Sequence, residues 1–323
     1  MVKKILKWIA LFLTFKLLFV LVVAQLGLDP RRDIATRERL CQKFDPNVVF
    51  IGTSRTLYGV NPALFDSLNA GKTRSYNMGL FSISFAHALQ IAENLIENER
   101  KTNTIFIELS ALDYSTMHLT PNQLFQDVYF RSRATGFASN MDDKEKVSEF
   151  LTDLNLTLFQ IFSIAPQIAA IKKLVKPVKD PIEGPPHLQD NGFQIVVDTL
   201  TGVNTMLINN QFYTKKLITT DRKSTPNLYY LSRINGIIAL ARSHGKSVVF
   251  FMPNNFTKGE FETLSHVMPY IPEANLISLP KDSRMDAIFK PVNLFDPHHL
   301  NMKGSAIYTT YLHAQFIQKS HVL

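Results

Sequence analysis

The stretch Asn47-Val-Val-Phe-Ile-Gly-Thr-Ser-Arg55 decides the fold that this sequence predicts. Its first half is a short apolar run of the kind that a parallel strand, buried on both faces, requires. Gly-Thr-Ser follows at once and predicts a sharp turn from that strand into a helix. A serine at such a turn lies at the carboxyl end of its strand, with its hydroxyl exposed. The stretch therefore predicts a buried strand that ends by presenting Ser54.

The same alternation of apolar runs and helical periodicity continues along the chain. Predicted strands cover 75–78, 104–109 and 247–252, with a fifth at either 275–278 or 288–294, and predicted helices cover 84–99, 228–243 and 302–318. Strands that alternate with helices indicate a parallel sheet covered on both faces. We therefore predict an α/β fold, a flavodoxin-like three-layer α/β/α sandwich around a central parallel sheet. Such sheets carry their sites at the carboxyl ends of the strands.

The N-terminal segment predicts a membrane anchor. Residues 5–24 are apolar except for a threonine and two lysines, of which Lys16 falls in mid-span. About 20 residues at a rise of about 1.5 Å cross the ~30 Å hydrocarbon core of a bilayer. We expect an uncleaved anchor over 1–25 and a linker over 26–45; a cleaved signal peptide and a buried helix of a soluble protein are the alternatives. Leading lysines favour a single-pass protein of the inner or plasma membrane, with its body exoplasmic or periplasmic.

Composition and charge exclude several classes of protein. The net charge is +8, and residues 1–40 hold eight basic against three acidic side chains, which is five of those charges. Basic residues that flank an anchor explain this charge better than a nucleic-acid-binding face. The single cysteine, Cys41, excludes an intramolecular disulfide and a cysteine-based metal site. We expect no nucleic-acid partner and no cofactor.

The body, expected over 46–323, is interrupted once. From about 114 to 226 the regular alternation stops, and a basic-apolar run and a proline-rich breaker follow. We interpret this stretch as an insertion. It is either a cap or partner surface beside the site, or extra scaffold without contact to the site.

A second group of residues lies just ahead of the last predicted helix, in Asp296-Pro-His-His299. An aspartate three residues before a histidine lets one turn present both side chains, so that the carboxylate orients the imidazole as a base. A serine nucleophile needs such a base and needs N–H donors for an oxyanion. We predict a catalytic triad of Ser54, Asp296 and His299. The alternatives are Ser54 as a helix N-cap and a metal site on Asp296, His298 and His299, for which no further cluster completes a shell.

Together these motifs resemble the SGNH/GDSL hydrolase superfamily over residues 46–112 and 228–312. Gly52-Thr-Ser-Arg55 resembles its first block, Asn77-Met-Gly79 its second, and Asp296 with His299 its last. The resemblance implies an oxyanion hole made by the N–H groups of Ser54 and Gly79, with Asn77 beside it as an oxyanion-binding or substrate-binding residue. Arg55 would then bind an anionic acceptor, or pin the loop through a structural salt bridge.

The third block departs from the superfamily pattern. Ser110-Ala-Leu-Asp113 has Leu112 where the family has an asparagine that donates to the oxyanion. Loss of one such donor costs about 10²–10³ in rate, which argues against a general secreted esterase.

The departure fits a subgroup better. N-terminally anchored SGNH-like proteins work beside membrane-bound O-acyltransferases in alginate O-acetylation and teichoic-acid D-alanylation. This resemblance implies an envelope glycan O-acyltransferase with an acyl-serine intermediate on Ser54. A membrane-bound O-acyltransferase would be the acyl donor and a cell-envelope polysaccharide the acceptor. A carbohydrate esterase or deacetylase of the same fold, and a non-catalytic assembly protein on a decayed SGNH fold, remain alternatives.

Overall fold

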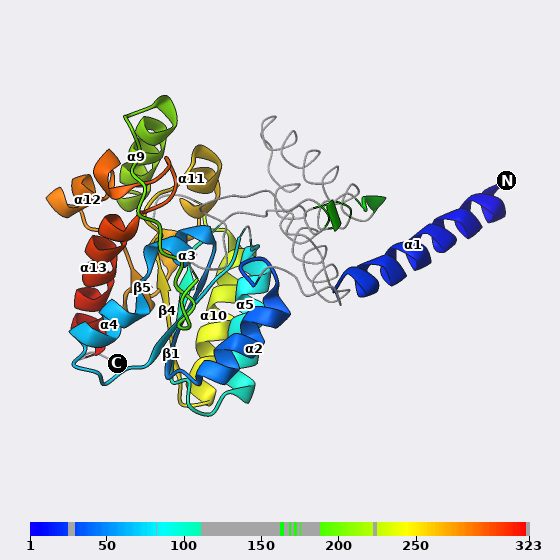
Figure 1. Cartoon of the computed structure of the whole chain (residues 1–323), viewed down its shortest axis with the longest axis horizontal. Coiled ribbons are helices and arrows are strands. Elements are labelled where there is room, and N and C mark those ends of the chain that lie inside the picture. Colours follow the sequence, from blue (N-terminus) through cyan, green and yellow to red (C-terminus); the bar gives the residue numbers. More distant parts are fainter. Residues whose placement is uncertain are drawn as a thin grey trace.

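The structure is a computed structural model, and it describes residues 1–24, 30–81, 83–110, 162–164, 168, 171, 172, 175, 188–221 and 225–320. Five parallel strands form one sheet in the order β2-β1-β3-β4-β5 (Figure 1). Their bounds are β1 Val48–Gly52, β2 Ser75–Gly79, β3 Thr104–Glu108, β4 Ser247–Phe251 and β5 Leu276–Ile277. This is the predicted α/β fold with a parallel sheet.

The strands are in register, so their carboxyl ends reach the same edge of the sheet. Gly52 at the end of β1 lies opposite Gly79 at the end of β2. Glu108 at the end of β3 lies opposite Phe251 at the end of β4. All five residues of β1 and of β2 are buried, as expected for strands that are covered on both faces. Everything that follows a strand therefore meets at this one edge.

Helices cover both faces of the sheet (Figure 1). The helices are α1 Val2–Ala24, α2 Ile34–Phe44, α3 Ser54–Gly59, α4 Pro62–Leu68, α5 Phe85–Asn98, α9 Thr205–Ile218, α10 Leu228–Ser243, α11 Lys258–Leu264, α12 Ser283–Ile288 and α13 Met302–Ser320. On one face, α2, α5 and α10 pack against the strands. On the other face, α3, α4 and α13 contact the strands, and α13 also packs on α3 and α4. Aromatic side chains fill both interfaces: Phe50 stacks on Phe106 at 4.5 Å between ring centroids on the α4–α13 side, and Phe85 stacks on Tyr230 at 5.7 Å on the other.

The strand and helix predictions are confirmed with small shifts at their ends, and one choice is settled. The fifth strand is Leu276–Ile277, which lies in the predicted alternative 275–278. The other alternative, 288–294, is wrong, because α12 ends there and a 3-10 turn over Pro291–Asn293 follows. Proline has no N–H to contribute to a sheet ladder.

The expected linker over 26–45 contains a helix of the body. Asp33 caps the start of α2 by accepting a hydrogen bond from Thr36 N at 2.9 Å. Arg37 and Cys41 of this helix are buried. Nη2 of Arg37 donates to the carbonyl oxygens of Asn77 and Gly79 in β2, which fastens α2 to the sheet. Residues 34–44 are therefore not a linker, and residues 25–29 lie outside the described part of the chain.

The predicted anchor corresponds to helix α1. Residues Val2–Val23 form a helix that is long and apolar enough to cross a membrane, by length and composition. A signal sequence near an N-terminus passes the same test. The helix projects from the body in Figure 1, and most of its apolar side chains are exposed.

The described end of the insertion packs beside the edge of the sheet where the strands have their carboxyl ends. Helix α9 packs on α11, and Gln194 N donates to Leu57 O in α3. Asn210 of α9 donates to Pro297 O, within the Asp-Pro-His-His stretch, at 3.1 Å. For residues 188–221, scaffold without contact to the site is therefore the wrong alternative. Most of 114–187 lies outside the described residues.

The close approach of β2 to α3 gives a stability prediction. A Cβ added at Gly79 would lie 2.3 Å from Leu57 N and 2.6 Å from Leu57 Cα, both backbone atoms. We expect Gly79→Ala to lower the free energy of unfolding by about 1–3 kcal/mol, the usual cost of overpacking. Gly236→Ala is the matched control, because a Cβ on this exposed residue of α10 meets nothing within 4 Å. It should raise that free energy by up to about 1 kcal/mol. Denaturant unfolding followed by circular dichroism measures both, and equal midpoints would contradict the packing described.

Candidate active site

Ser54 lies at the carboxyl end of the central strand β1, at the start of α3. The N-cap of α3 is Thr53, whose side chain accepts a hydrogen bond from Arg55 N at 3.2 Å. The alternative that Ser54 serves as the N-cap is therefore wrong. Gly52 is required at the end of the strand, because a Cβ there would lie 2.6 Å from Glu108 Cβ and 2.1 Å from Thr56 Oγ1. The predicted strand–turn–helix is present, and capping by Thr53 leaves the hydroxyl of Ser54 available.

The three residues of the predicted triad meet. Ser54 Oγ lies 2.8 Å from His299 Nε2. On the other side of the ring, His299 Nδ1 lies 2.7 Å from Asp296 Oδ2. A carboxylate can only accept, so Nδ1 carries the proton and Nε2 is left to accept a hydrogen bond from the serine hydroxyl. This is the arrangement that a serine nucleophile with a general base requires.

The surroundings hold the aspartate ionised and the imidazole in place. Burial raises the pKa of Asp296, but the hydrogen bond and charge of His299 and the backbone N–H groups of His298 and His299 outweigh burial and leave this pKa below its ordinary value. The ring of His299 lies nearly parallel to that of Phe295, 5.4 Å away, and edge-on to Tyr58 at 5.3 Å. The base is therefore oriented by one carboxylate and two aromatic rings.

The two backbone N–H groups that were expected to bind the oxyanion differ in whether a protein atom already accepts a hydrogen bond from them. Ser54 is the first residue of α3, where helix N–H groups have no partner within the helix, and no described residue accepts a hydrogen bond from its N–H. The N–H of Gly79, in contrast, donates to Asn77 Oδ1 at 2.8 Å. The N–H of the next residue, Leu80, donates to Gly52 O at 2.9 Å. The predicted role of Gly79 as an oxyanion donor is thus not supported by this structure, and Leu112 lies outside the described residues.

Asn77 links β2 to α3 through buried side-chain hydrogen bonds. Its side chain is fully buried, and its Nδ2 donates to Thr56 O and to Val60 O, both at 2.7 Å. Val60 is the C-cap of α3, where helices leave carbonyl groups without partners within the helix. Asn77 therefore joins α3 to β2, and the expectation that it binds substrate is not supported by this structure.

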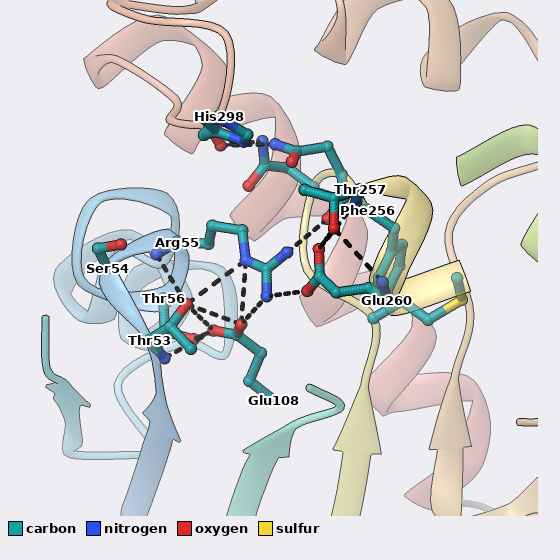
Figure 2. A network of polar contacts seen from close by, with 12 residues as sticks. Thr53, Ser54, Arg55, Thr56, Glu108, Phe256, Thr257, Glu260 and His298 are labelled. Carbon is teal, nitrogen blue, oxygen red and sulfur yellow. Dashed lines mark hydrogen bonds and ion pairs between the residues drawn. The ribbon is translucent and has the colours of Figure 1, made fainter. Parts of the chain in front are cut away.

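Arg55 is also buried and committed to protein partners. Its Nη2 lies 2.9 Å from Glu108 Oε1 and 2.7 Å from Glu260 Oε1, and all three side chains are nearly inaccessible to solvent. Figure 2 shows its guanidinium between these two carboxylates, which come from the end of β3 and from α11. The alternative of a structural salt bridge holds, and Arg55 is not placed to bind an anionic acceptor.

Five polar residues that contact sequence neighbours of Ser54 and His299 were not predicted from the sequence. Two are glutamates on Arg55 (Glu108 and Glu260), and three are asparagines on His298 (Asn210, Asn254 and Asn255). One signal was present, since Glu108 ends a strand that is otherwise apolar. A carboxylate in a strand covered on both faces needs a buried partner. The asparagines carry no comparable pattern, because their partners are backbone carbonyls distant in sequence.

The metal alternative lacks a ligand shell in the described part of the chain, where no group of three or more His, Cys, Asp or Glu side chains could hold an ion. Nδ1 of His298 lies 3.1 Å from Asn210 Nδ2. That amide is a donor, so Nδ1 accepts and is occupied. Burial, followed by the charge of His299, lowers the pKa of His298, which favours its neutral form.

Comparisons with known proteins give no match. No protein-family model, no curated protein and no solved structure matches the chain. The function proposed below therefore rests on the geometry of the site and on the resemblance of its motifs.

Whether Asn77 clamps the fold or binds substrate can be tested by stability. Asn77→Ala would leave Gly79 N and Val60 O without their partner, whereas Thr56 O would keep its hydrogen bond from Val60 N. We expect the free energy of unfolding to fall by about 2–4 kcal/mol, since each buried unpaired group costs about 1–3 kcal/mol. The control is Asn98→Ala, which removes one exposed hydrogen bond to Asn94 and should change stability by less than about 0.5 kcal/mol. A substrate-binding role would instead leave the unfolding midpoint of Asn77→Ala close to that of the wild type.

Proposed function

We propose that this chain is a membrane-anchored serine acyltransferase of the SGNH/GDSL type. Ser54 accepts an acyl group and passes it to a hydroxyl of a cell-envelope polysaccharide. The observation that carries the proposal is the 2.8 Å contact between Ser54 Oγ and His299 Nε2, with Asp296 on the other ring nitrogen. The position of Ser54, at the carboxyl end of the central strand of a parallel sheet, supports it, because α/β sheets place their sites there.

The proposed reaction has two halves. His299 Nε2 takes the proton of Ser54 as Oγ attacks the carbonyl carbon of the acyl donor, and the Ser54 N–H binds the oxyanion that forms. The protonated imidazole then gives its proton to the leaving group, which departs and leaves an acyl-serine. In the second half His299 deprotonates the acceptor hydroxyl, whose oxygen attacks the acyl-serine. The proton returns to Ser54 Oγ as the product leaves.

Transfer is favoured over hydrolysis by the state of the oxyanion donors. Of the two expected backbone donors, the N–H of Gly79 is bonded to Asn77, so the described residues offer the N–H of Ser54 alone. A missing donor costs about 10²–10³ in rate, which suits a site completed by a partner better than a free-standing esterase. We propose that a membrane-bound O-acyltransferase is that partner and the acyl donor. A helix able to cross a membrane, α1, would keep the site beside it.

The direct test is whether Ser54 becomes acylated. The full chain in detergent micelles, as wild type and as Ser54→Ala, is incubated with a small activated acetyl ester, and intact mass and ester turnover are recorded. We expect an acetyl adduct on the wild type alone, released slowly to water and faster to an added envelope oligosaccharide. Rapid turnover without an adduct would favour the esterase. Neither adduct nor turnover in the wild type would contradict acylation of Ser54 by such an ester.

The role of Asp296 gives a second prediction. In Asp296→Asn the amide can donate to Nδ1, which moves the ring proton to Nε2 and removes the acceptor for the serine proton. We expect acylation of Ser54 to slow by about 10⁴-fold, as an Asp→Asn change does in a serine protease triad. Asp282→Asn, which alters an exposed ion pair with Arg284, is the control and should match the wild type.

The lowered pKa of Asp296 also gives a prediction for how acylation of Ser54 in the wild type depends on pH. Because the pKa of Asp296 is lowered, its ionised form persists as the pH falls to below the ordinary aspartate value of about 3.9. Loss of acylation between pH 6 and pH 4 should therefore not arise from Asp296. A carboxyl signal of Asp296 that titrates above its ordinary value, followed by NMR, would contradict this assignment.

A further inference from the structure

The two halves of the triad are far apart in the sequence and must be held in register. Ser54 and His299 are 245 positions apart. Ser54 lies on the turn between β1 and α3, and His299 lies on the loop before α13. A network of buried polar groups runs between these two segments (Figure 2).

On the Ser54 side, the carboxylate of Glu108 holds the turn from both ends. It accepts hydrogen bonds from Thr53 N at 2.9 Å and Thr53 Oγ1 at 2.8 Å, just before the serine. It also accepts one from Thr56 Oγ1 at 2.6 Å, two residues after the serine. Ser54 is therefore flanked by residues that are fixed to the end of the neighbouring strand.

Arg55 is the residue after Ser54, and all three nitrogens of its guanidinium make contacts in this network. Nε and Nη2 donate to Glu108 Oε1 at 3.2 and 2.9 Å. Nη2 also pairs with Glu260 Oε1 at 2.7 Å. Nη1 donates to the backbone oxygen of Asn255 at 2.8 Å, beyond the end of β4.

On the His299 side, two asparagines form hydrogen bonds to the backbone of the preceding residue, His298. The side-chain amides of Asn255 and Asn254 both donate to His298 O, at 2.5 and 3.0 Å. Asn255 thus receives a hydrogen bond from Arg55 through its backbone and gives one to His298 through its side chain. The path from the neighbour of the serine to the neighbour of the histidine is unbroken.

We infer that Arg55 is a positioning residue which, through Asn255, sets the separation of Ser54 Oγ and His299 Nε2. A planar guanidinium can reach two carboxylates and a carbonyl at once, whereas the ammonium of a lysine is one nitrogen at the end of a flexible chain. Glu108 and Glu260 orient the guanidinium, and Asn255 transmits its position to the histidine loop. The effect on rate rests on the proposed function; the effect on the interatomic distance does not.

The test uses two variants of the full chain, each with a matched control. Arg55→Lys removes the three-way contact of the guanidinium. Asn255→Ala keeps the ion pairs and the backbone acceptor and removes only the amide on His298. The controls are Arg233→Lys, which alters an ion pair of 3.0 Å with Glu93 between α10 and α5, and Asn275→Ala, which removes a buried amide on Val248 O near β5.

Two readouts separate positioning from general stabilisation. The first is acetylation of Ser54 by the activated ester at increasing concentration, below the melting temperature of every variant. The second is the distance between Ser54 Oγ and His299 Nε2 in crystal structures. A misplacement of about 1 Å costs about 10²-fold in rate. We expect Arg55→Lys to lower the maximal rate about 100-fold and Asn255→Ala about tenfold, with the half-saturating concentration within about threefold of wild type.

In both variants that distance should exceed about 3.5 Å, beyond hydrogen-bond reach. Both controls should keep the wild-type distance and rate. The inference is overturned if Arg55→Lys and Asn255→Ala retain the 2.8 Å contact, or if they lose only the stability that the controls also lose. If Arg55→Lys does not fold, Asn255→Ala decides alone. If wild-type Ser54 is not acylated, the proposed function fails, while the distances in the crystals still decide this inference.

Discussion

Glu108 brings a carboxylate to the end of an apolar strand, where almost none of it is exposed to solvent. A charge in that position is tolerated only when it is paired and fully hydrogen-bonded. The turn after β1 meets this requirement with the backbone and hydroxyl of Thr53, the hydroxyl of Thr56 and the guanidinium of Arg55. The conformation that presents Ser54 is thus largely the conformation that satisfies a neighbouring carboxylate.

Other polar groups in the first two motifs also have their partners within the fold. Arg55 forms ion pairs with Glu108 and Glu260. Asn77 donates hydrogen bonds to the backbone carbonyls of Thr56 and Val60. Gly79 provides room for α3 and gives its N–H to Asn77. Among the described residues, the triad groups and the N–H of Ser54 remain at this edge of the sheet. In the proposed function, the acyl-serine forms at this site and a partner supplies further stabilisation of the oxyanion.

The sequence was sufficient for those parts of the structure that depend on local pattern. Continuous apolar runs located β1, β3 and β4, and the Asp-x-x-His spacing located the histidine loop, because both signals lie within a few neighbouring residues. The roles of Arg55, Asn77 and Gly79 could not be obtained in this way. The carbonyl and carboxylate partners of Arg55 and Asn77 are distant in the sequence, as Asn255 is from Arg55. Gly79 donates to nearby Asn77, but its close approach to Leu57 comes from the packing of α3 on β2. Helix α2 was missed for the same reason, since Arg37 is buried by β2 and by Gly192.

The fifth strand shows the limit of periodicity itself. Two short apolar stretches, 275–278 and 288–294, were equivalent by pattern, and only the pairing of Leu276–Ile277 with β4 distinguishes them. Two-residue strands depend on the sheet edge that they join more than on their own composition.

The most direct measurement of the central claim is covalent capture of the nucleophile. The full chain is treated with a fluorophosphonate, which reacts with a serine hydroxyl that a neighbouring base activates, and the modified peptide is mapped by mass spectrometry. If His299 activates Ser54, the phosphonyl group will be found on Ser54 in the wild type and will be lost in His299→Gln. An unmodified Ser54 in the folded wild-type protein, or equal modification in His299→Gln, would contradict a nucleophilic role for this serine.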